Sequence, residues 1–149
     1  MKVSFADGTV VQGRGLMKEI VSIKDDETPT WALYLDEEWQ IQPVTWPYQL
    51  VSWPDGQAPS DDDELFEATV GAWNRAKSGD LIEIGCYGGT GRTGAVIACI
   101  ALLAGVPVDE APEWTRRNYH RWAIENHEDV ITRFAHWRIR RTSSSSQAS

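Results

Sequence analysis

Apolar residues in the first third of the chain occur in short runs separated by glycine, proline and acidic residues. Runs of this length and spacing are typical of β-strands. We expect strands over residues 3–5, 9–11, 19–24 and 31–35. Asp7-Gly8 lies between the first two runs and predicts a tight hairpin turn. A fifth apolar run, residues 48–53, ends at a turn that begins with Pro54.

From residue 60 onward the apolar positions recur every three or four residues, which predicts helices. We expect helices over residues 60–76, 93–104, 109–119 and 126–139. The second of these is apolar on nearly every side, so it should be a central buried helix. A short apolar run over residues 81–84 precedes it and fits a buried strand. The first helix should begin at Ser60, whose side chain can cap it.

The last residues of the chain are polar and rich in serine, which predicts a disordered tail over residues 142–149. The preceding residues 1–141 have the length of a single domain. A β-rich N-terminal third followed by helices around one internal strand indicates an α/β fold.

The chain is acidic, with a net charge of −8 from 14 Lys and Arg against 22 Asp and Glu. This balance argues against a nucleic acid or an anionic membrane as partner, because Lys and Arg lead the binding of both. It does not exclude a phosphate substrate, because one local loop can bind an anion on an acidic protein. No apolar run approaches the ~20 residues of a membrane helix. With no signal-peptide pattern at the start, we expect a cytoplasmic protein.

The two cysteines, Cys86 and Cys99, lie in different settings and do not indicate a disulfide framework. Cys99 falls inside the apolar helix and is expected to be a small buried side chain. The three histidines have no metal-ligand spacing and are expected at the surface of the last helices. We therefore expect no metal and no cofactor.

Residues 86–93, Cys-Tyr-Gly-Gly-Thr-Gly-Arg-Thr, lie between the expected strand 81–84 and the central helix. A helix N-terminus leaves about four backbone N–H groups unpaired and carries partial positive charge. A glycine-rich turn before it can aim further N–H groups at one anion. Arg92 can add a two-pronged contact to phosphate oxygens. The same positive field favours the thiolate of Cys86, which could attack phosphorus.

Two other glycine-loop functions fit the segment less well. Residues 89–94 match the dinucleotide pattern G-x-G-x-x-G, but the residues that follow predict helices and no further strands. A nucleotide-binding P-loop requires lysine where Arg92 stands. Neither function gives a role to Cys86.

The loop resembles the signature of the cysteine-dependent protein tyrosine phosphatases, which include dual-specificity members. That signature, Cys-x-x-Gly-x-x-Arg-Ser/Thr, is matched at Cys86, Gly89, Arg92 and Thr93. Trp53-Pro54-Asp55 resembles the acid loop of the same family. The resemblance covers residues 48–119 and implies a central mixed β-sheet flanked by helices.

The resemblance also implies a role for each matched residue. Cys86 would be the nucleophile, Asp55 the proton donor and then the base, and Thr93 the stabiliser of the leaving thiolate. The phosphoryl oxygens would be held by Arg92 and by the loop residues Tyr87, Gly88, Gly89, Thr90 and Gly91.

Two positions depart from the family pattern. Many members have histidine before the cysteine, where this chain has Gly85, so one support of the loop is missing. Larger members place the second-step water with a glutamine in a late loop. Residues 123–129 contain no glutamine, and Asn126 is the candidate substitute.

The resemblance implies hydrolysis of phosphotyrosine in proteins, with phosphoserine and phosphothreonine as further possible substrates. A phosphorylated protein is then the expected partner, and the chain is expected to be a monomer. Residues 87–91 contain no lysine, which disfavours a multiply phosphorylated lipid. A phosphate-binding pseudophosphatase, or a phosphatase of a small molecule or phosphoinositide, remains the alternative.

Overall fold

The computed structural model describes residues 1–16, 28–36 and 44–148. Within these residues one mixed sheet has the strand order β1-β2-β5-β3-β4. The strands are β1 (Lys2–Ser4), β2 (Val10–Gly15), β3 (Trp31–Leu35), β4 (Tyr48–Val51) and β5 (Ile82–Cys86). β1 is antiparallel to β2, and the other neighbours are parallel. The strand expected over residues 19–24 lies outside the described residues.

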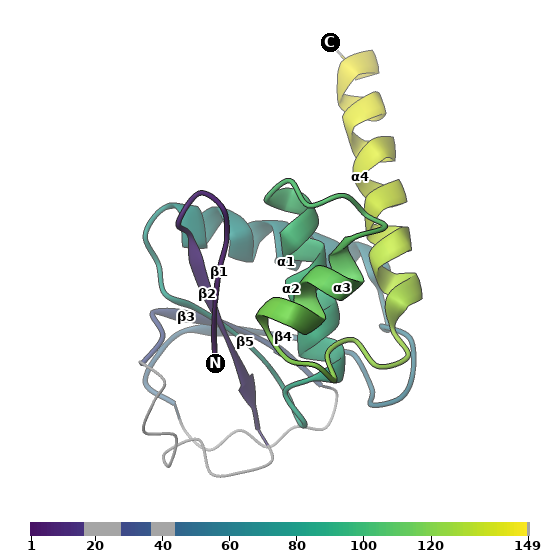
Figure 1. Cartoon of the computed structure of the whole chain (residues 1–149). Helices are drawn as coiled ribbons and strands as arrows, with labels where there is room; N and C mark the ends of the chain where they lie inside the picture. Colours follow the sequence, from purple (N-terminus) through teal and green to yellow (C-terminus); the bar gives the residue numbers. More distant parts are fainter. Residues whose placement is uncertain (17–27, 37–43, 149) are drawn as a thin grey trace.

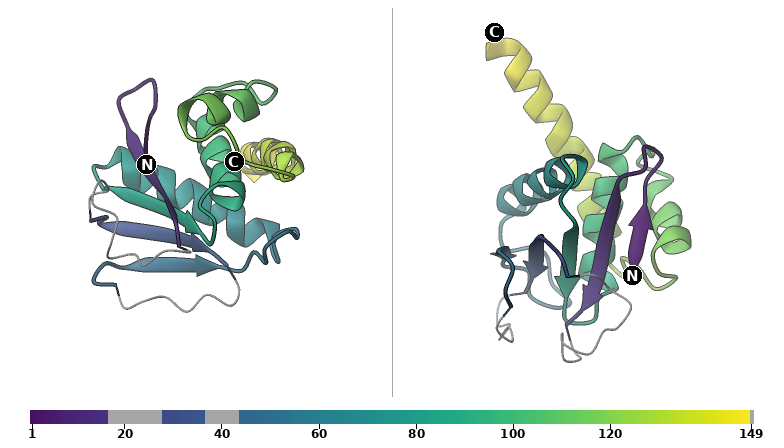
Figure 2. Two further views of the ribbon diagram at one scale, coloured as in Figure 1. Left: turned by 60° about the horizontal axis from the view of Figure 1, so that its bottom comes forward. Right: turned by 90° about the vertical axis from the view of Figure 1, so that its left-hand side faces the viewer.

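The described helices are α1 (Asp62–Lys77), α2 (Gly91–Leu103), α3 (Ala111–Asn118) and α4 (Glu128–Ala148). They gather on one face of the sheet, with α2 between the other three (Figures 1 and 2). Every residue of α2 from Gly91 to Leu102 is buried, as the apolar pattern predicted. The α/β fold with a central mixed sheet is therefore confirmed.

Strand residues alternate between two environments because successive side chains point to opposite faces of a sheet. Leu33 and Ile84 belong to the main core beneath the helices. Ala32 and Tyr34 belong to a second, smaller cluster on the opposite face. Glu83 is fully buried, so the sheet is covered on both sides. This burial explains why β3 reads as a continuous apolar run.

The predicted hairpin joins β1 to β2. Phe5 N–H donates to Thr9 O at 2.9 Å, and Gly8 has φ +88°. The Asp7 carboxylate accepts the Thr9 amide at 2.9 Å, and this hydrogen bond lowers the pKa of Asp7. The turn thus forms as the Asp-Gly pair predicted.

The four parallel strands all end at the same edge of the sheet. Gly15 of β2 pairs with Cys86 of β5, and Leu35 of β3 pairs with Val51 of β4. The segments that follow these strands therefore meet at the carboxyl edge, where ligands bind in open α/β sheets.

The four helices begin and end one or two residues from their predicted bounds, except that α4 is longer. Asp61, not Ser60, is the N-cap of α1, because its carboxylate accepts the Glu64 amide at 3.2 Å. Helix α4 continues to Ala148 and extends away from the body (Figure 1), whereas the serine-rich composition predicted a disordered tail from Thr142. Once packed turns have started a helix, adding a further residue such as serine changes the free energy only by its small difference in helix propensity from a better helix former. The buried side chains of Ile131 and Phe134 supply that start.

Candidate active site

Cys86 ends β5, and its side chain lies at the start of the loop that leads into α2. The residue is only 2% exposed. Gly89 N–H donates to the Cys86 sulfur at 3.2 Å. The loop therefore curls around the thiol and directs a backbone dipole at it, as expected for an anion nest.

Strand β2 supports this loop from one side. Leu16 N–H donates to Cys86 O at 2.9 Å and to Tyr87 O at 3.0 Å. Gly89 has φ +76°, and a Cβ placed on it would lie 2.4 Å from Gly15 N. Only glycine fits both the backbone angle and the available space at residue 89. The loop and the end of β2 are thus packed backbone against backbone.

The helical layer supports the loop from the other side. Tyr119 Oη donates to Gly89 O at 2.5 Å, and Ile124 N–H donates to Thr90 O at 3.1 Å. Thr90 is the N-cap of α2, yet its hydroxyl donates to Glu125 at 3.1 Å and makes no capping hydrogen bond. The first turn of α2 is therefore not capped by that side chain, which leaves its amides available to an anion bound at the helix start.

Arg92 lies in the first turn of α2 and is 2% exposed. Its Nη1 donates to Trp53 O at 2.7 Å and to Leu35 O at 3.1 Å. Asp36 lies 3.7 Å from Nη1, and Asp55 lies 3.6 Å from Nη2. The guanidinium thus joins the ends of β3 and β4 to the cysteine loop, in one fixed orientation.

Asp55 lies in the loop after β4 and is 84% exposed at its side chain. The neighbouring Trp53 is fully buried, and its Nε1 donates to Gln57 O at 2.8 Å. The tryptophan therefore anchors the loop while the carboxylate remains at the surface. In the sequence motif Trp53-Pro54-Asp55, the first residue thus holds the loop in place and the last presents its carboxylate to solvent.

Thr93 is fully buried in the first turn of α2. Among the described residues its Oγ1 has no hydrogen-bond partner. Leaving a buried hydroxyl unpaired costs free energy. The Thr93 hydroxyl is therefore available to donate a hydrogen bond to a group that forms during a reaction at the loop.

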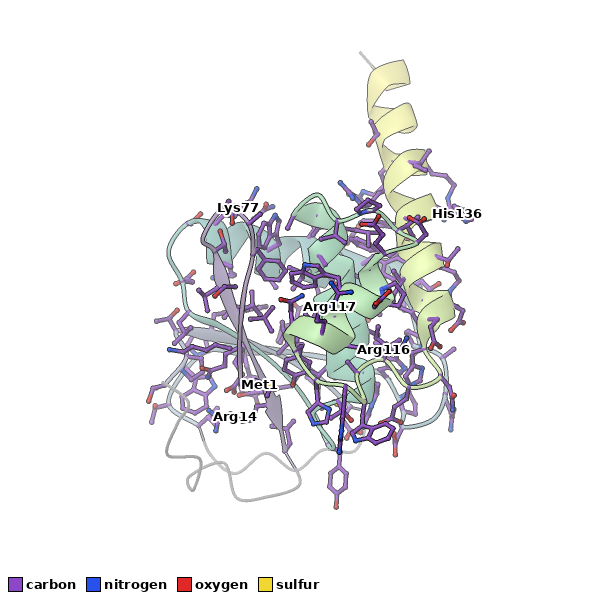
Figure 3. The ribbon with its side chains drawn as sticks, in the orientation of Figure 1. Met1, Arg14, Lys77, Arg116, Arg117 and His136 are labelled. Carbon is purple, nitrogen blue, oxygen red and sulfur yellow. The ribbon has the colours of Figure 1, made fainter. Side chains whose placement is uncertain are left out.

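A buried polar network lies on the opposite face of the sheet, beneath Cys86. Glu83 accepts Arg14 Nε at 2.5 Å and Gln12 Nε2 at 2.9 Å. Tyr34 Oη donates to the second Glu83 oxygen at 2.6 Å and accepts Trp46 Nε1 at 2.9 Å. Burial and the Glu83 carboxylate raise the pKa of Tyr34 well above its usual range. Figure 3 shows Arg14 on the sheet side of the molecule.

This network explains the missing histidine before the nucleophile. A Cβ on Gly85 would lie 2.9 Å from the Tyr34 ring and 3.3 Å from Leu16. The tyrosine therefore fills the space that a side chain at residue 85 would need. Tyr34 was not predicted as part of the site, because only the strand register places it beside Gly85.

A small cleft of about 200 Å³ lies beside the loop. Its polar lining residues are Asp55, Gln57, Glu125, Asn126, His127 and Asp129. His127 was expected at the surface, but it is only 9% exposed, with its ring 5.1 Å from the Trp53 ring. Burial lowers its pKa. The expectation for His127 was therefore wrong, because the residue precedes α4 and packs against the acid loop.

The second cysteine, Cys99, is a free thiol buried within α2, and burial raises its pKa far above the usual range. Cys86 is free as well. Within the described residues no three His, Cys, Asp or Glu side chains converge as metal ligands. Nor does any described helix combine the length and apolar character needed to cross a membrane.

The model of one protein family, described as protein-tyrosine phosphatase, matches residues 12–116. The match spans more than half of the chain and includes both the acid loop and the cysteine loop. The chain belongs to the protein-tyrosine phosphatase family. No curated protein matches the whole sequence closely enough to be counted as a relative.

Solved structures share the fold of this phosphatase. Tk-PTP in its active form is 23% identical, with a TM-score of 0.60 over 71% of this chain and 77% of that one. PTPMT1 is 14% identical, with a TM-score of 0.71 over 97% of this chain and 99% of that one. The PP-IP phosphatase SIW14 from S. cerevisiae is 21% identical, with a TM-score of 0.58 over 80% and 76%. At these identities the likeness shows the fold alone.

Proposed function

We propose that this phosphatase hydrolyses phosphotyrosine in proteins through a phosphocysteine intermediate, with phosphoserine and phosphothreonine as further substrates. The observation that carries the proposal is the bridge made by Arg92. Arg92 directly follows the cysteine loop, its side chain is buried, and its guanidinium lies 3.6 Å from Asp55. This contact links the proposed proton donor to the residue proposed to bind phosphate, which supports a shared role for the acid loop and the cysteine loop.

In the first step the Cys86 thiolate attacks phosphorus, and the bond from phosphorus to the phenolic oxygen breaks. Protonated Asp55 donates its proton to that oxygen, so the leaving group departs as a neutral phenol. Arg92 and the amides of residues 87–91 hold the three phosphoryl oxygens, as a preorganised set of donors should.

In the second step water attacks the phosphocysteine. The Asp55 carboxylate takes a proton from that water, and the bond from phosphorus to sulfur breaks to release inorganic phosphate. The Thr93 hydroxyl, which has no partner among the described residues, donates to the departing Cys86 thiolate. The enzyme then returns to its starting state.

Two features support a protein substrate over a densely phosphorylated small molecule. Residues 87–91 carry no lysine. The carboxylate of Glu125 accepts the Thr90 hydroxyl at the loop and would repel additional phosphates. The structural likeness to the PP-IP phosphatase SIW14 is a reason to test small-molecule phosphates as well. A comparison of substrates decides between a phosphorylated protein and a small molecule.

The test is Asp55→Asn assayed against aryl phosphates with leaving groups of different basicity. Asparagine keeps the size of the side chain but cannot donate a proton to the phenolate. We expect a loss of roughly 10²–10⁴-fold for phosphotyrosine, because general acid catalysis supplies that much. The loss should be much smaller for an activated aryl phosphate, whose leaving group needs little protonation.

The control is Asp109→Asn, which removes an exposed carboxylate beyond the far end of α2. It should leave turnover unchanged for every substrate. Equal losses for Asp55→Asn across all leaving groups would show that another residue donates the proton. Faster turnover of inositol polyphosphates than of phosphotyrosyl peptides would favour the small-molecule alternative.

A further inference from the structure

We infer that the cleft beside the cysteine loop is a second binding site, which takes a basic side chain of the substrate close to the phosphorylated residue. The inference rests on the proposed function, because it places a peptide across the loop. The ligand is a guanidinium or ammonium group that reaches the cleft while the phosphoryl group lies in the loop.

The position of the cleft makes this contact possible. Asp55, in the acid loop, and Glu125, in the segment before α4, both line it. Glu125 accepts the Thr90 hydroxyl, and a Cβ placed on Gly91 would lie 3.2 Å from Glu125 Cδ, so the cleft opens beside the start of α2. A residue adjacent to the phosphorylated one would therefore extend into it.

His127 is the observation that indicates a ligand. The ring is nine-tenths buried, lines the cleft, and has no side-chain hydrogen bond within the described parts of the chain. Burial lowers its pKa, so the ring is neutral at physiological pH and keeps one nitrogen as an acceptor. Neither ring nitrogen is among the fully buried unpaired atoms of the described residues, so the acceptor nitrogen is open to the cleft and can receive a donor from a ligand.

The other lining groups favour a cation. Glu125 and Asp129 contribute two carboxylates, while Asp55 carries the proton that it donates in the first step. Arg133 of α4 pairs with Asp129, and Arg92 lies 3.6 Å from Asp55. A bound phosphoryl group would occupy Arg92 and neutralise it. The cleft would then hold more negative than positive charge, and its acceptors would suit a ligand that carries only donors.

The size of the cleft sets the size of the ligand. Its volume of about 200 Å³ is below the ~300–1,000 Å³ of sites for drug-sized molecules. It fits the head of one side chain rather than a second small molecule. An arginine or lysine stem would pass over Ala58 and Val130, the apolar part of the lining.

The experiment uses phosphotyrosyl peptides of one sequence that differ at a single neighbouring residue, which is Arg, Gln or Glu. The variable residue is moved through the two positions on each side of phosphotyrosine. Turnover, as kcat/KM, is measured with the wild-type protein. Binding, as Kd, is measured with Cys86→Ser, which cannot turn the peptides over.

At one position we expect Arg to exceed Gln by about threefold to tenfold, with Glu below Gln, because one or two partly screened ion pairs supply that range. The preference should weaken as salt is raised. Glu125→Gln keeps an acceptor for Thr90 but removes the charge, and should bring the ratio toward one. Asp129→Asn should reduce the ratio too, and Asp109→Asn should leave it unchanged.

The outcomes separate this inference from the proposed function. Hydrolysis of a simple aryl phosphate with no preference among the peptides would overturn the second site and leave the phosphatase function intact. A preference that survived both Glu125→Gln and Asp129→Asn would place the basic residue elsewhere. If aryl phosphate were not hydrolysed, the proposed function would fall, and the Kd ratio of Cys86→Ser would still decide the binding site.

Discussion

Gly89→Ala should harm both the stability and the activity of the protein, because residue 89 joins the cysteine loop to the sheet. The substitution adds one methyl group at φ +76°. That methyl would lie 2.4 Å from Gly15 N, 2.5 Å from Gly15 Cα and 2.9 Å from the Arg14 carbonyl carbon. All three atoms are backbone of β2, so no side-chain rotation relieves the overlap.

The expected magnitude combines two effects. A left-handed backbone costs a residue other than glycine about 1–2 kcal/mol. Overpacking of a well-packed region adds about 1–3 kcal/mol. The free energy of unfolding should therefore fall by about 2–5 kcal/mol. Because the Gly89 amide donates to the Cys86 sulfur, a loop shift of about 1 Å should also lower kcat/KM by about 10²-fold.

Two matched glycine variants isolate these effects in urea unfolding and aryl phosphate assays. Gly79→Ala has φ +106° with nothing within 4 Å, so it should show the backbone cost alone. Gly71→Ala lies inside α1 with open space around it and should stabilise the protein by up to about 1 kcal/mol. Neither should change kcat/KM. If Gly89→Ala behaved like Gly79→Ala in both assays, the close packing of loop against β2 would be wrong.

Three further changes test other parts of the site. Tyr34→Phe should lower the free energy of unfolding by about 2–3 kcal/mol in urea titrations, because Glu83 and Trp46 both lose a buried partner; an unchanged midpoint would contradict this. His127 has a folded pKa below its unfolded value of about 6.5, so the unfolded chain binds more protons and stability falls as pH drops through that range. His127→Gln should therefore flatten the unfolding profile between about pH 7 and 5, and an identical profile would show that other groups titrate there. Arg92→Lys should reduce kcat/KM for aryl phosphate more than tenfold, since lysine cannot reproduce the planar guanidinium geometry; a smaller loss would mean that Arg92 does not contact the phosphoryl group.

Local signals predicted the elements that carry the motifs. The bounds of β3 match the expected strand at both ends, because Trp31–Leu35 is a continuous apolar run between turns. The cysteine loop was predicted as a strand-to-helix turn because its glycines and the apolar segments around it agree. In both cases the determining information lies within a few residues.

Contacts between distant segments could not be read from the same patterns. Tyr34 faces Gly85 only because β3 and β5 are neighbours in the sheet. Glu125 reaches Thr90 across 35 residues, and His127 packs on Trp53 from the start of the last helix. Strand order and helix packing determine these contacts, and neither can be read from local sequence. For this reason the sequence of residues 123–129 indicated only Asn126 as a candidate site residue, and not Glu125 or His127.

Rapid-quench mass spectrometry of the protein during turnover of an aryl phosphate tests the covalent mechanism most directly. The phosphoryl group should appear on the peptide that contains Cys86, while Cys99, buried within α2, should stay unmodified. Cys86→Ser should show neither the adduct nor turnover, yet should still bind phosphate through Arg92 and the loop amides. Turnover by Cys86→Ser, or a phosphoryl group on any other residue, would contradict the account.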